Sequence, residues 1–384
     1  MNAIELLDII SKGETSTVQF KLNVNNEKSI AQEMVAFANT KGGTILIGVH
    51  DKTWEIVGLS DDDLRRLTDL LVNASSQHVK EPLFIETDTV DYEGKKILIV
   101  NVPEGIAKPY KDNDGIIFMK NGANKRKVTS NEEISRLLQS SGYLYAEEKV
   151  IFQSSTEDID IKKFKDFYQK KYKETFDDDR IESYLENLKL GSDGRVTIAG
   201  ALLFGKKVEK LIPQFFITAI WFRGDEIENT EYRSSTNITG TLDELYRQGY
   251  DFIVSKLAKV QAGQSFNTIG KLEVPEIVIT ELLINALIHR DYFINDSIKL
   301  FLFDNRIEII SPGKLPNSLT EELIRKGVSR SRNSIISSLA PDLMEYRGAG
   351  SGILRSIQAY PEIQFKNDIH GEQFIVKIPR PQKD

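Results

Sequence analysis

The sequence predicts an α+β multidomain protein, and three observations support this fold class. The chain has 384 residues, more than a single hydrophobic core usually organises, so two or three domains are expected. Its hydrophobic fraction of 40% and charged fraction of 28% are those of an ordinary globular protein. Segments with helical spacing and short apolar strand segments both occur along the whole chain, without an internal repeat.

The first 142 residues are predicted to form an α+β domain. Residues 28–40 place apolar side chains at helical spacing, and the pair Gly42-Gly43 ends that helix before a buried strand at 44–49. The other predicted elements of this domain are helix 61–73, strands 85–90 and 96–102 around the turn Glu93-Gly94, strand 116–120, and helix 132–140 after the capping box Ser130–Glu133.

A charged linker at 146–149 is predicted to lead into a middle α/β region, 150–260, and a C-terminal domain, 261–384. The elements predicted there are a helical segment 160–190 with a turn at Asp177–Asp179, an apolar segment 197–205, strand 215–222, helices 241–260 and 276–289, a hairpin of strands 298–303 and 306–310, helices 319–326 and 333–339, a helix opened by the glycine-rich turn 348–352, and strand 373–378.

Composition excludes several classes of protein. The chain has no cysteine, which excludes disulfides and thiolate metal sites, and its four histidines lack metal-ligand spacing. The N-terminus lacks the features of a signal peptide, and no apolar run approaches the ~18 residues of a membrane span. We therefore expect a cytoplasmic protein without a membrane partner. The net charge of −7 means that any nucleic-acid binding must use local basic patches.

The predicted helix 276–289 carries a row of polar residues along one face, here called the polar ridge. Glu281, Asn285 and His289 lie at i, i+4 and i+8, on one face of a helix that is otherwise apolar. Burying such a ridge is costly unless it meets a ligand or a metal. A hydrogen-bonded core helix is the alternative, and the ridge alone does not decide between the two.

Three alternating glycines, Gly348, Gly350 and Gly352, precede a second apolar helix. Such a turn lets backbone N–H groups approach phosphate oxygens at a helix N-terminus, although it can also be an ordinary turn. A basic run lies between these two motifs and could bind phosphates or form a solvated face. Its members are Arg325, Lys326, Arg330 and Arg332.

The order and spacing of these motifs resemble the GHKL ATPase family, and most closely its RecG-like C-terminal subgroup. The subgroup's hallmarks appear here as NALIHRDY (285–292), RIEIISPGKLP (306–316) and SRSRN (329–333). The resemblance implies a GHKL-like α/β sandwich that binds ATP and Mg²⁺. It implies that Asn285 holds Mg²⁺, that Glu281 is the catalytic base and that the three glycines hold phosphates. The other implied nucleotide-binding residues are His289, Gly313 and Arg332.

One departure concerns adenine recognition. Most GHKL proteins have an Asp in a D-x-G-x-G motif after a strand, and the corresponding stretch here, Ile309–Pro316, has none. Adenine selection and hydrolysis are the properties that depend on it. A pocket degenerated into a scaffold is therefore an alternative, and a weak ATPase is another.

The N-terminal domain resembles the Schlafen AlbA-type domain, a nucleic-acid-associated module. The resemblance covers about residues 10–140 and rests on Glu14–Lys21 (ETSTVQFK) and Phe37–Asp51, with Gly58 closing a hairpin. Some Schlafen members are nucleases with three carboxylates. Glu14 and Asp51 match two of them, but Gln19 stands where the third acid falls. Because an amide does not bind Mg²⁺ as a carboxylate does, we do not expect a nuclease.

The segment Lys120–Lys127 (KNGANKRK) is the best local phosphate patch, with four positive charges and no acid from Gly115 to Asn131. An exposed hairpin without a ligand is the alternative, and for Asn39 helix capping is the alternative. The predicted nucleic-acid-binding residues are Lys21, Asn39, Lys41, Lys120, Lys125, Arg126 and Lys127.

These features predict a transcriptional regulator, or another nucleic-acid-binding regulator, whose state is controlled by a nucleotide in the C-terminal domain. The expected partners are DNA and further copies of the chain, since both resembled families tend to dimerise. Many relatives carry a winged helix after the last strand, for which this chain leaves no room. Two alternatives stay open: an ATPase or Schlafen-like nuclease in nucleic-acid metabolism or defence, and a catalytically dead oligomeric scaffold.

Overall fold

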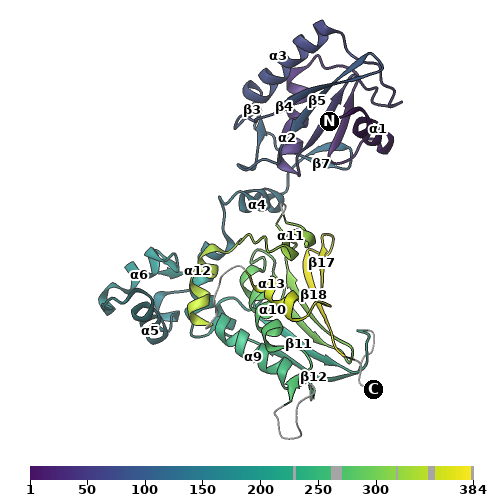
Figure 1. Cartoon of the computed structure of the whole chain (residues 1–384). Coiled ribbons are helices and arrows are strands. Elements are labelled where there is room, and N and C mark those ends of the chain that lie inside the picture. Colours follow the sequence, from purple (N-terminus) through teal and green to yellow (C-terminus); the bar gives the residue numbers. More distant parts are fainter. Residues whose placement is uncertain (228–230, 261–269, 317–318, 345–350, 382–384) are drawn as a thin grey trace. The chain divides into compact units, whose positions relative to one another are not determined.

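The computed structural model describes residues 1–227, 231–260, 270–316, 319–344 and 351–381. It divides the chain into two compact units, Met1–Leu144 and Tyr145–Asp384 (Figure 1). Each unit combines helices with its own sheet, which confirms the predicted α+β multidomain fold.

The first unit is built around a four-stranded sheet. Its helices are α1 (Ala3–Lys12), α2 (Glu27–Asn39), α3 (Asp61–Gln77) and α4 (Asn131–Ser140). Its strands are β1 (Val18–Lys21), β2 (Gly43–Ile47), β3 (Val79–Lys80), β4 (Glu86–Tyr92), β5 (Lys95–Val102), β6 (Lys111–Asp112), β7 (Phe118–Asn121) and β8 (Asn124–Lys127). The sheet has the order β1-β2-β5-β4, in which β1 and β2 are parallel and the other pairs antiparallel.

Helices cover both faces of this sheet, because neighbouring residues of a strand point to opposite sides. Ile45 and Ile47 of β2 belong to the core formed with α2 and α3. Leu46, between them, belongs to a second core that includes Leu6 of α1. Both faces of β2 are therefore buried, which explains its continuous apolar run.

The second unit is built around a six-stranded sheet. Its helices are α5 (Ile161–Tyr172), α6 (Ile181–Asn187), α7 (Ile198–Phe204), α8 (Val208–Leu211), α9 (Leu242–Val254), α10 (Glu276–His289), α11 (Glu321–Arg325), α12 (Ser334–Leu343) and α13 (Gly352–Ala359). Its strands are β9 (Gly191–Ser192), β10 (Arg195–Val196), β11 (Ile217–Phe222), β12 (Tyr232–Ile238), β13 (Lys259–Val260), β14 (Lys271–Leu272), β15 (Ile298–Leu302), β16 (Arg306–Pro312), β17 (Gln364–Asp368) and β18 (Gln373–Pro379). Three short 3₁₀ turns among the described residues complete the two units: Ala146–Glu148, Thr156–Asp158 and Asp178–Arg180.

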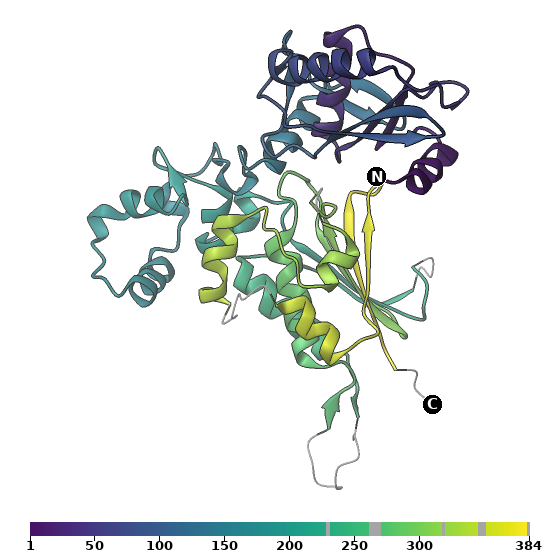
Figure 2. The same cartoon turned by 45° about the horizontal axis from the view of Figure 1, so that its top comes forward.

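The large sheet has the order β12-β11-β15-β16-β18-β17, in which only β11 and β15 are parallel. In both views α9, α10 and α13 lie together against this sheet (Figure 2). Because α10 lies between its neighbours and the sheet, most of its residues are buried, which explains why its sequence is apolar almost all round.

The predicted boundary between residues 260 and 261 falls inside the second unit. β11 and β12, from the predicted middle region, pair into the same sheet as β15 from the predicted C-terminal domain. One hydrophobic core extends through both regions. The segment 146–149, predicted as a charged linker, contributes to the packing of the second unit, because Ala146 and Glu147 are completely buried.

Some elements were not predicted as such. The N-terminal stretch is a helix, α1, held by a capping box between Asn2 and Glu5. β1, β12 and β17 were also missed. β12 is mostly exposed and rich in Ser and Thr, so it lacks the apolar alternation by which strands are predicted.

Candidate functional site

A cavity of about 300 Å³ opens between α10, β16, the first turn of α13 and the segment 327–332 that precedes α12. It brings together five of the residues predicted to bind nucleotide, which are far apart in the sequence. These are Asn285, His289, Gly313, Arg332 and Gly352. Gly348 and Gly350 lie outside the described residues.

The walls of the cavity divide by chemistry. Apolar side chains come from the sheet and from α10, α11 and α13, while polar groups come from α10, β16 and the segment 329–332. The apolar residues include Ile288, Ile309, Leu319, Ile324, Ile353, Phe365 and Phe374, and the polar ones include Asn285, His289, Ser311, Ser329, Arg330 and Arg332. An apolar pocket with a few convergent polar groups is the usual form of a small-molecule site.

The amide of Asn285 is the most telling of these groups. Its Nδ2 atom is buried and has no hydrogen-bond partner among the described residues. Buried polar atoms are nearly always hydrogen-bonded, so an unpartnered one on a cavity wall indicates an unfilled ligand position. This arrangement fits the oxygen of a nucleotide or of its hydration shell.

His289 lies one turn further along α10, at the end of the helix. Burial, together with the positive charge of Arg332, lowers the pKa of its imidazole to about 4. The ring is therefore neutral at pH 7 and offers the cavity one donor and one acceptor without a charge.

Arg332 is fixed at the cavity wall by contacts on two sides. Its Nη1 atom donates to Asp291 Oδ2 at 3.1 Å, and its Nη2 atom donates to the carbonyl of Lys314. Gly313 lets this guanidinium approach: its φ is +103°, and a Cβ there would lie 2.7 Å from Arg332 Nη1. Both features explain why glycine is needed at residue 313.

Ser311 lines the cavity at the end of β16, within the stretch that lacks an Asp. Its hydroxyl donates to the carbonyl of Ala286 at 3.1 Å. Its proton is thus engaged with the backbone of α10, and its oxygen retains only acceptor capacity.

Glu281, the predicted catalytic base, is ion-paired in this structure. Its side chain is only 2% exposed, is not among the residues that line the cavity, and lies with Oε1 2.5 Å from Arg355 Nη2 of α13. In this arrangement the carboxylate is held by Arg355 and does not face the cavity.

Sequence reasoning missed the residues that hold this site together. The side chain of Asn333 is completely buried and donates to the carbonyls of Ile288 and Arg290, at 2.8 and 2.9 Å, at the end of α10. Glu147 accepts hydrogen bonds from the backbone of Ile335 and Ile336 at the start of α12. The motifs SRSRN and NALIHRDY, which contain Asn333 and its two partners, were the sequence signals near these contacts.

In the first unit, the structure contradicts two predicted nucleic-acid contacts. Asn39 is completely buried, donates to the carbonyls of Tyr110 and Phe118, and accepts from the N–H of Tyr110. Lys120 also points inward, with a side chain that is 0% exposed. Neither side chain can reach a phosphate at the surface.

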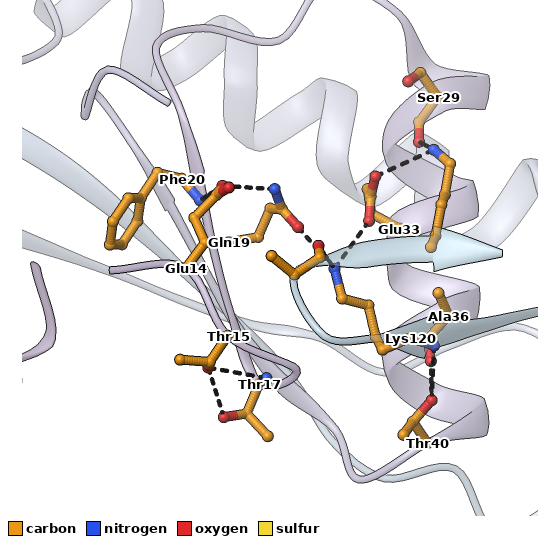
Figure 3. A network of polar contacts seen from close by, with 12 residues as sticks. Glu14, Thr15, Thr17, Gln19, Phe20, Ser29, Glu33, Ala36, Thr40 and Lys120 are labelled. Atoms are coloured by element: carbon orange, nitrogen blue, oxygen red, sulfur yellow. Dashed lines mark hydrogen bonds and ion pairs between the residues drawn. The ribbon is translucent and has the colours of Figure 1, made fainter. Parts of the chain in front are cut away.

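Lys120 joins a buried polar network with Gln19, Glu14 and Glu33 (Figure 3). Its Nζ atom donates to Gln19 Oε1 at 2.7 Å and lies 3.5 Å from Glu33 Oε2. Gln19 in turn donates to Glu14 Oε1 at 2.6 Å. Burial lowers the pKa of the Lys120 ammonium, and the carboxylate of Glu33 opposes that effect. Gln19 therefore connects a carboxylate to an ammonium, a role that needs one donor and one acceptor.

The rest of the predicted basic patch is partly neutralised. Lys125 Nζ lies 3.2 Å from Glu33 Oε1, and Arg126 forms a two-point ion pair with Glu133. Lys41 and Lys127 are exposed and Lys21 is half-buried. Among the predicted residues, these three keep their charge nearest to solvent.

Neither a metal-binding cluster nor a membrane-spanning helix is found within the described ranges. No group of three His, Asp or Glu side chains there could hold a metal ion. No helix there has the length and apolar character required to cross a bilayer.

Two family models match the chain. The model described as "Schlafen, AlbA_2" matches residues 14–129, and the one described as "Putative ATP-dependent DNA helicase recG C-terminal" matches residues 295–378. No curated protein matches.

Two solved structures are similar to the chain. The DIP2311 protein from Corynebacterium diphtheriae is 19% identical, with 99% of this chain and 80% of that chain covered, at a TM-score of 0.47. The N-terminal domain of a helicase RecG-related protein from Nitrosomonas europaea is 25% identical, with 34% of this chain and 96% of that chain covered, at a TM-score of 0.26.

The match to the Schlafen AlbA_2 family model lies inside the first unit. The match to the RecG C-terminal family model contains the strands β15 to β18 of the large sheet. The chain thus combines a Schlafen AlbA_2 domain with a domain of the RecG C-terminal type.

Proposed function

We propose that this protein is a nucleic-acid-binding regulator, such as a transcriptional regulator, whose state is controlled by an ATP-type nucleotide in the second unit. The two domain types relate it to nucleic acids and to ATP. The observation that carries the proposal is the cavity, because it joins five predicted nucleotide-binding residues around the unpartnered amide of Asn285.

The lining suits a nucleotide in two respects. The apolar walls can enclose a base, while Arg330 and Arg332 supply positive charge for phosphates. Mg²⁺ typically binds through one or two protein ligands together with substrate phosphates and waters. Asn285, with its side-chain oxygen turned to the ion, fits such a site without a cluster of carboxylates.

In the first unit, Lys21, Lys41 and Lys127 are the proposed contacts to a nucleic-acid backbone. Such contacts are electrostatic and largely independent of base sequence. Specificity for DNA and assembly into a homo-oligomer are parts of the same proposal, and they rest on the resemblance of both domains to families that bind DNA and dimerise.

An ATPase is the second candidate, and it would require Arg355 to release Glu281, whose carboxylate is ion-paired and is not among the residues that line the cavity. A nuclease is disfavoured by the network around Gln19, in which Lys120 supplies the positive charge beside Glu14 and Glu33. The third candidate, an inert scaffold, would bind no nucleotide.

The first test is equilibrium binding of ATP and ADP with Mg²⁺ to the full chain. We expect the wild type to bind and Asn285→Ala to bind about ten-fold to a hundred-fold more weakly, as for the loss of a buried polar contact. Asn237→Ala, an exposed amide on β12, is the matched control and should bind like the wild type. Absence of binding by the wild type would support the scaffold instead.

The regulatory part is tested by measuring DNA affinity with and without the nucleotide over a range of salt concentrations. The double variant Lys41→Glu, Lys127→Glu should weaken binding and flatten its salt dependence by about one unit of log-log slope per lost phosphate contact. The double variant Lys162→Glu, Lys170→Glu, which replaces two exposed lysines on α5, controls for total charge. Equal DNA affinity with and without ATP would refute the regulation.

A further inference from the structure

Four buried polar atoms between α10 and α13 lack hydrogen-bond partners among the described residues. They are Glu281 Oε2, Asn285 Nδ2, Arg355 Nε and Arg355 Nη2. Glu281 and Asn285 are one turn apart on α10, and α13, which carries Arg355, packs directly on α10. Such a concentration of unpartnered atoms in a buried place is uncommon and calls for an explanation.

The contact between Arg355 and Glu281 does not satisfy these atoms. Arg355 Nη2 lies 2.5 Å from Glu281 Oε1, yet neither Nη2 nor Nε directs an N–H at an acceptor. The two charges attract each other, but the guanidinium does not form the two-point contact that it commonly makes with a carboxylate. These two nitrogens are buried and form no well-directed hydrogen bond, so the guanidinium loses little hydrogen bonding when its side chain turns towards the cavity.

The available groups match an oxyanion. Asn285 and Arg355 together offer three nitrogen donors, and only Glu281 Oε2 is an acceptor. Asn285 lines the cavity, and so do Gly352 and Ile353 in the first turn of α13, just before Arg355. A phosphate seated beside Asn285 would thus be close to the helix that carries the guanidinium.

The exposure of the two charged side chains shows which of them can move. The side chain of Glu281, on the buried side of α10, is 2% exposed. The side chain of Arg355 is 35% exposed, long and flexible. A phosphate carries more negative charge than a carboxylate and offers more acceptor oxygens, so it competes well for the guanidinium.

We propose that Arg355 is a phosphate ligand of the cavity, and that Glu281 holds it in place until a nucleotide arrives. This inference rests on the proposed nucleotide binding. It gives Glu281 a role as a positioning residue, which keeps the guanidinium beside Asn285 when no phosphate is bound. It also predicts that the site distinguishes nucleotides by their phosphates.

The test compares the binding of adenosine, ADP and ATP with Mg²⁺ to the full chain and its variants by calorimetry. Arg355→Met should weaken ATP binding about ten-fold to a hundred-fold and leave adenosine binding within two-fold, since only the phosphate contact is lost. Glu281→Gln should strengthen ATP binding, because the guanidinium no longer has to leave a carboxylate. Arg233→Met, which removes an ion-paired arginine on β12, is the matched control.

Three outcomes separate this inference from the proposal on which it rests. If the wild type binds neither adenosine nor ATP, the proposed function itself fails. If the wild type binds ATP and Arg355→Met binds it equally well, Arg355 is not a phosphate ligand. If Arg355→Met and Glu281→Gln both weaken adenosine and ATP alike, the pair only clamps α10 to α13. Arg355→Lys, which keeps the charge, should restore part of the ATP affinity if Arg355→Met folds poorly.

Discussion

At the scale of the residue, the same side-chain type has different consequences depending on what surrounds it. Lys41 and Lys120 were both predicted to contact nucleic acid, yet Lys41 is exposed and Lys120 is buried against Gln19. His289 is a third example, because burial and Arg332 keep its imidazole neutral. The chemistry of each residue therefore follows from its neighbours.

His289 gives a prediction about stability and pH. Its pKa is about 4 in the folded chain against an ordinary value of 6.5, so the unfolded state binds a proton first as the pH falls. The stabilising contribution of the neutral ring is therefore complete above pH 6.5 and is lost on acidification from 6.5 towards 4. At pH 5 the loss should reach at most about 2 kcal/mol.

Urea unfolding of the wild type and of His289→Gln at pH 7.5 and pH 5 measures this loss. The wild type should lose more unfolding free energy between the two pH values than the variant loses. Parallel pH dependence in both proteins would show that His289 is protonated in the folded state.

At the scale of the element, α10 depends on a residue that follows it by more than forty positions. Asn333 donates to two carbonyls at the end of the helix, which otherwise would be buried without a partner. Arg290, the next residue after α10, donates to the carbonyls of Ile294 and Asp296 and so fixes the turn. The position of Asn285 and His289 thus depends on contacts outside their own helix.

Replacing Asn333 by Ala should lower the unfolding free energy by about 2–3 kcal/mol, because two buried carbonyls lose their donor. ATP binding should weaken as well, since the cavity end of α10 is no longer held. Denaturant unfolding and nucleotide titration measure these effects, with Asn237→Ala as the exposed-amide control. Unchanged stability would mean that water replaces the amide at both carbonyls.

At the scale of the whole molecule, Glu147 connects the start of the second unit to α12, which follows the cavity segment 327–332. It is completely buried, and it accepts backbone hydrogen bonds from Ile335 and Ile336, at 2.9 and 2.8 Å. Burial raises the pKa of its carboxyl group, and these N–H groups partly oppose the rise. Arg332 of the cavity is only three residues from Ile335, so a change at the cavity can reach Glu147 through one short segment.

Glu147→Ala should therefore bind ATP nearly as the wild type does and lose most of the effect of ATP on DNA affinity. The neighbouring Glu148→Ala is the matched control, because Glu148 is partly exposed and pairs only with Lys189 among the contacts described for it. Measuring DNA affinity with and without ATP in all three proteins checks this. If ATP changes the DNA affinity of a folded Glu147→Ala variant as much as that of the wild type, Glu147 does not connect nucleotide binding to DNA binding.

Short-range patterns along the chain were enough to predict the local elements and the motifs. Apolar spacing predicted α2, α9 and α10, and the pair Gly42-Gly43 predicted the end of α2, because these signals act over a few residues. The capping box predicted at Ser130 coincides with the start of α4, although Ser130 forms no side-chain capping hydrogen bond there. The motifs around Asn285, Gly313 and Arg332 predicted nucleotide-binding residues, and the structure places them on one cavity.

Which polar side chains remain available to a ligand depends on long-range packing. The burial of Lys120 and Asn39, the contact of Glu281 with Arg355 and the cap of Glu147 on α12 all join residues distant in the sequence. The joining of the predicted middle region to the large sheet is likewise a matter of strand pairing over long separations. A polar residue at a given spacing has the same local signal whether it faces water, a ligand or a buried partner. What separates these cases is the desolvation and pairing that packing imposes.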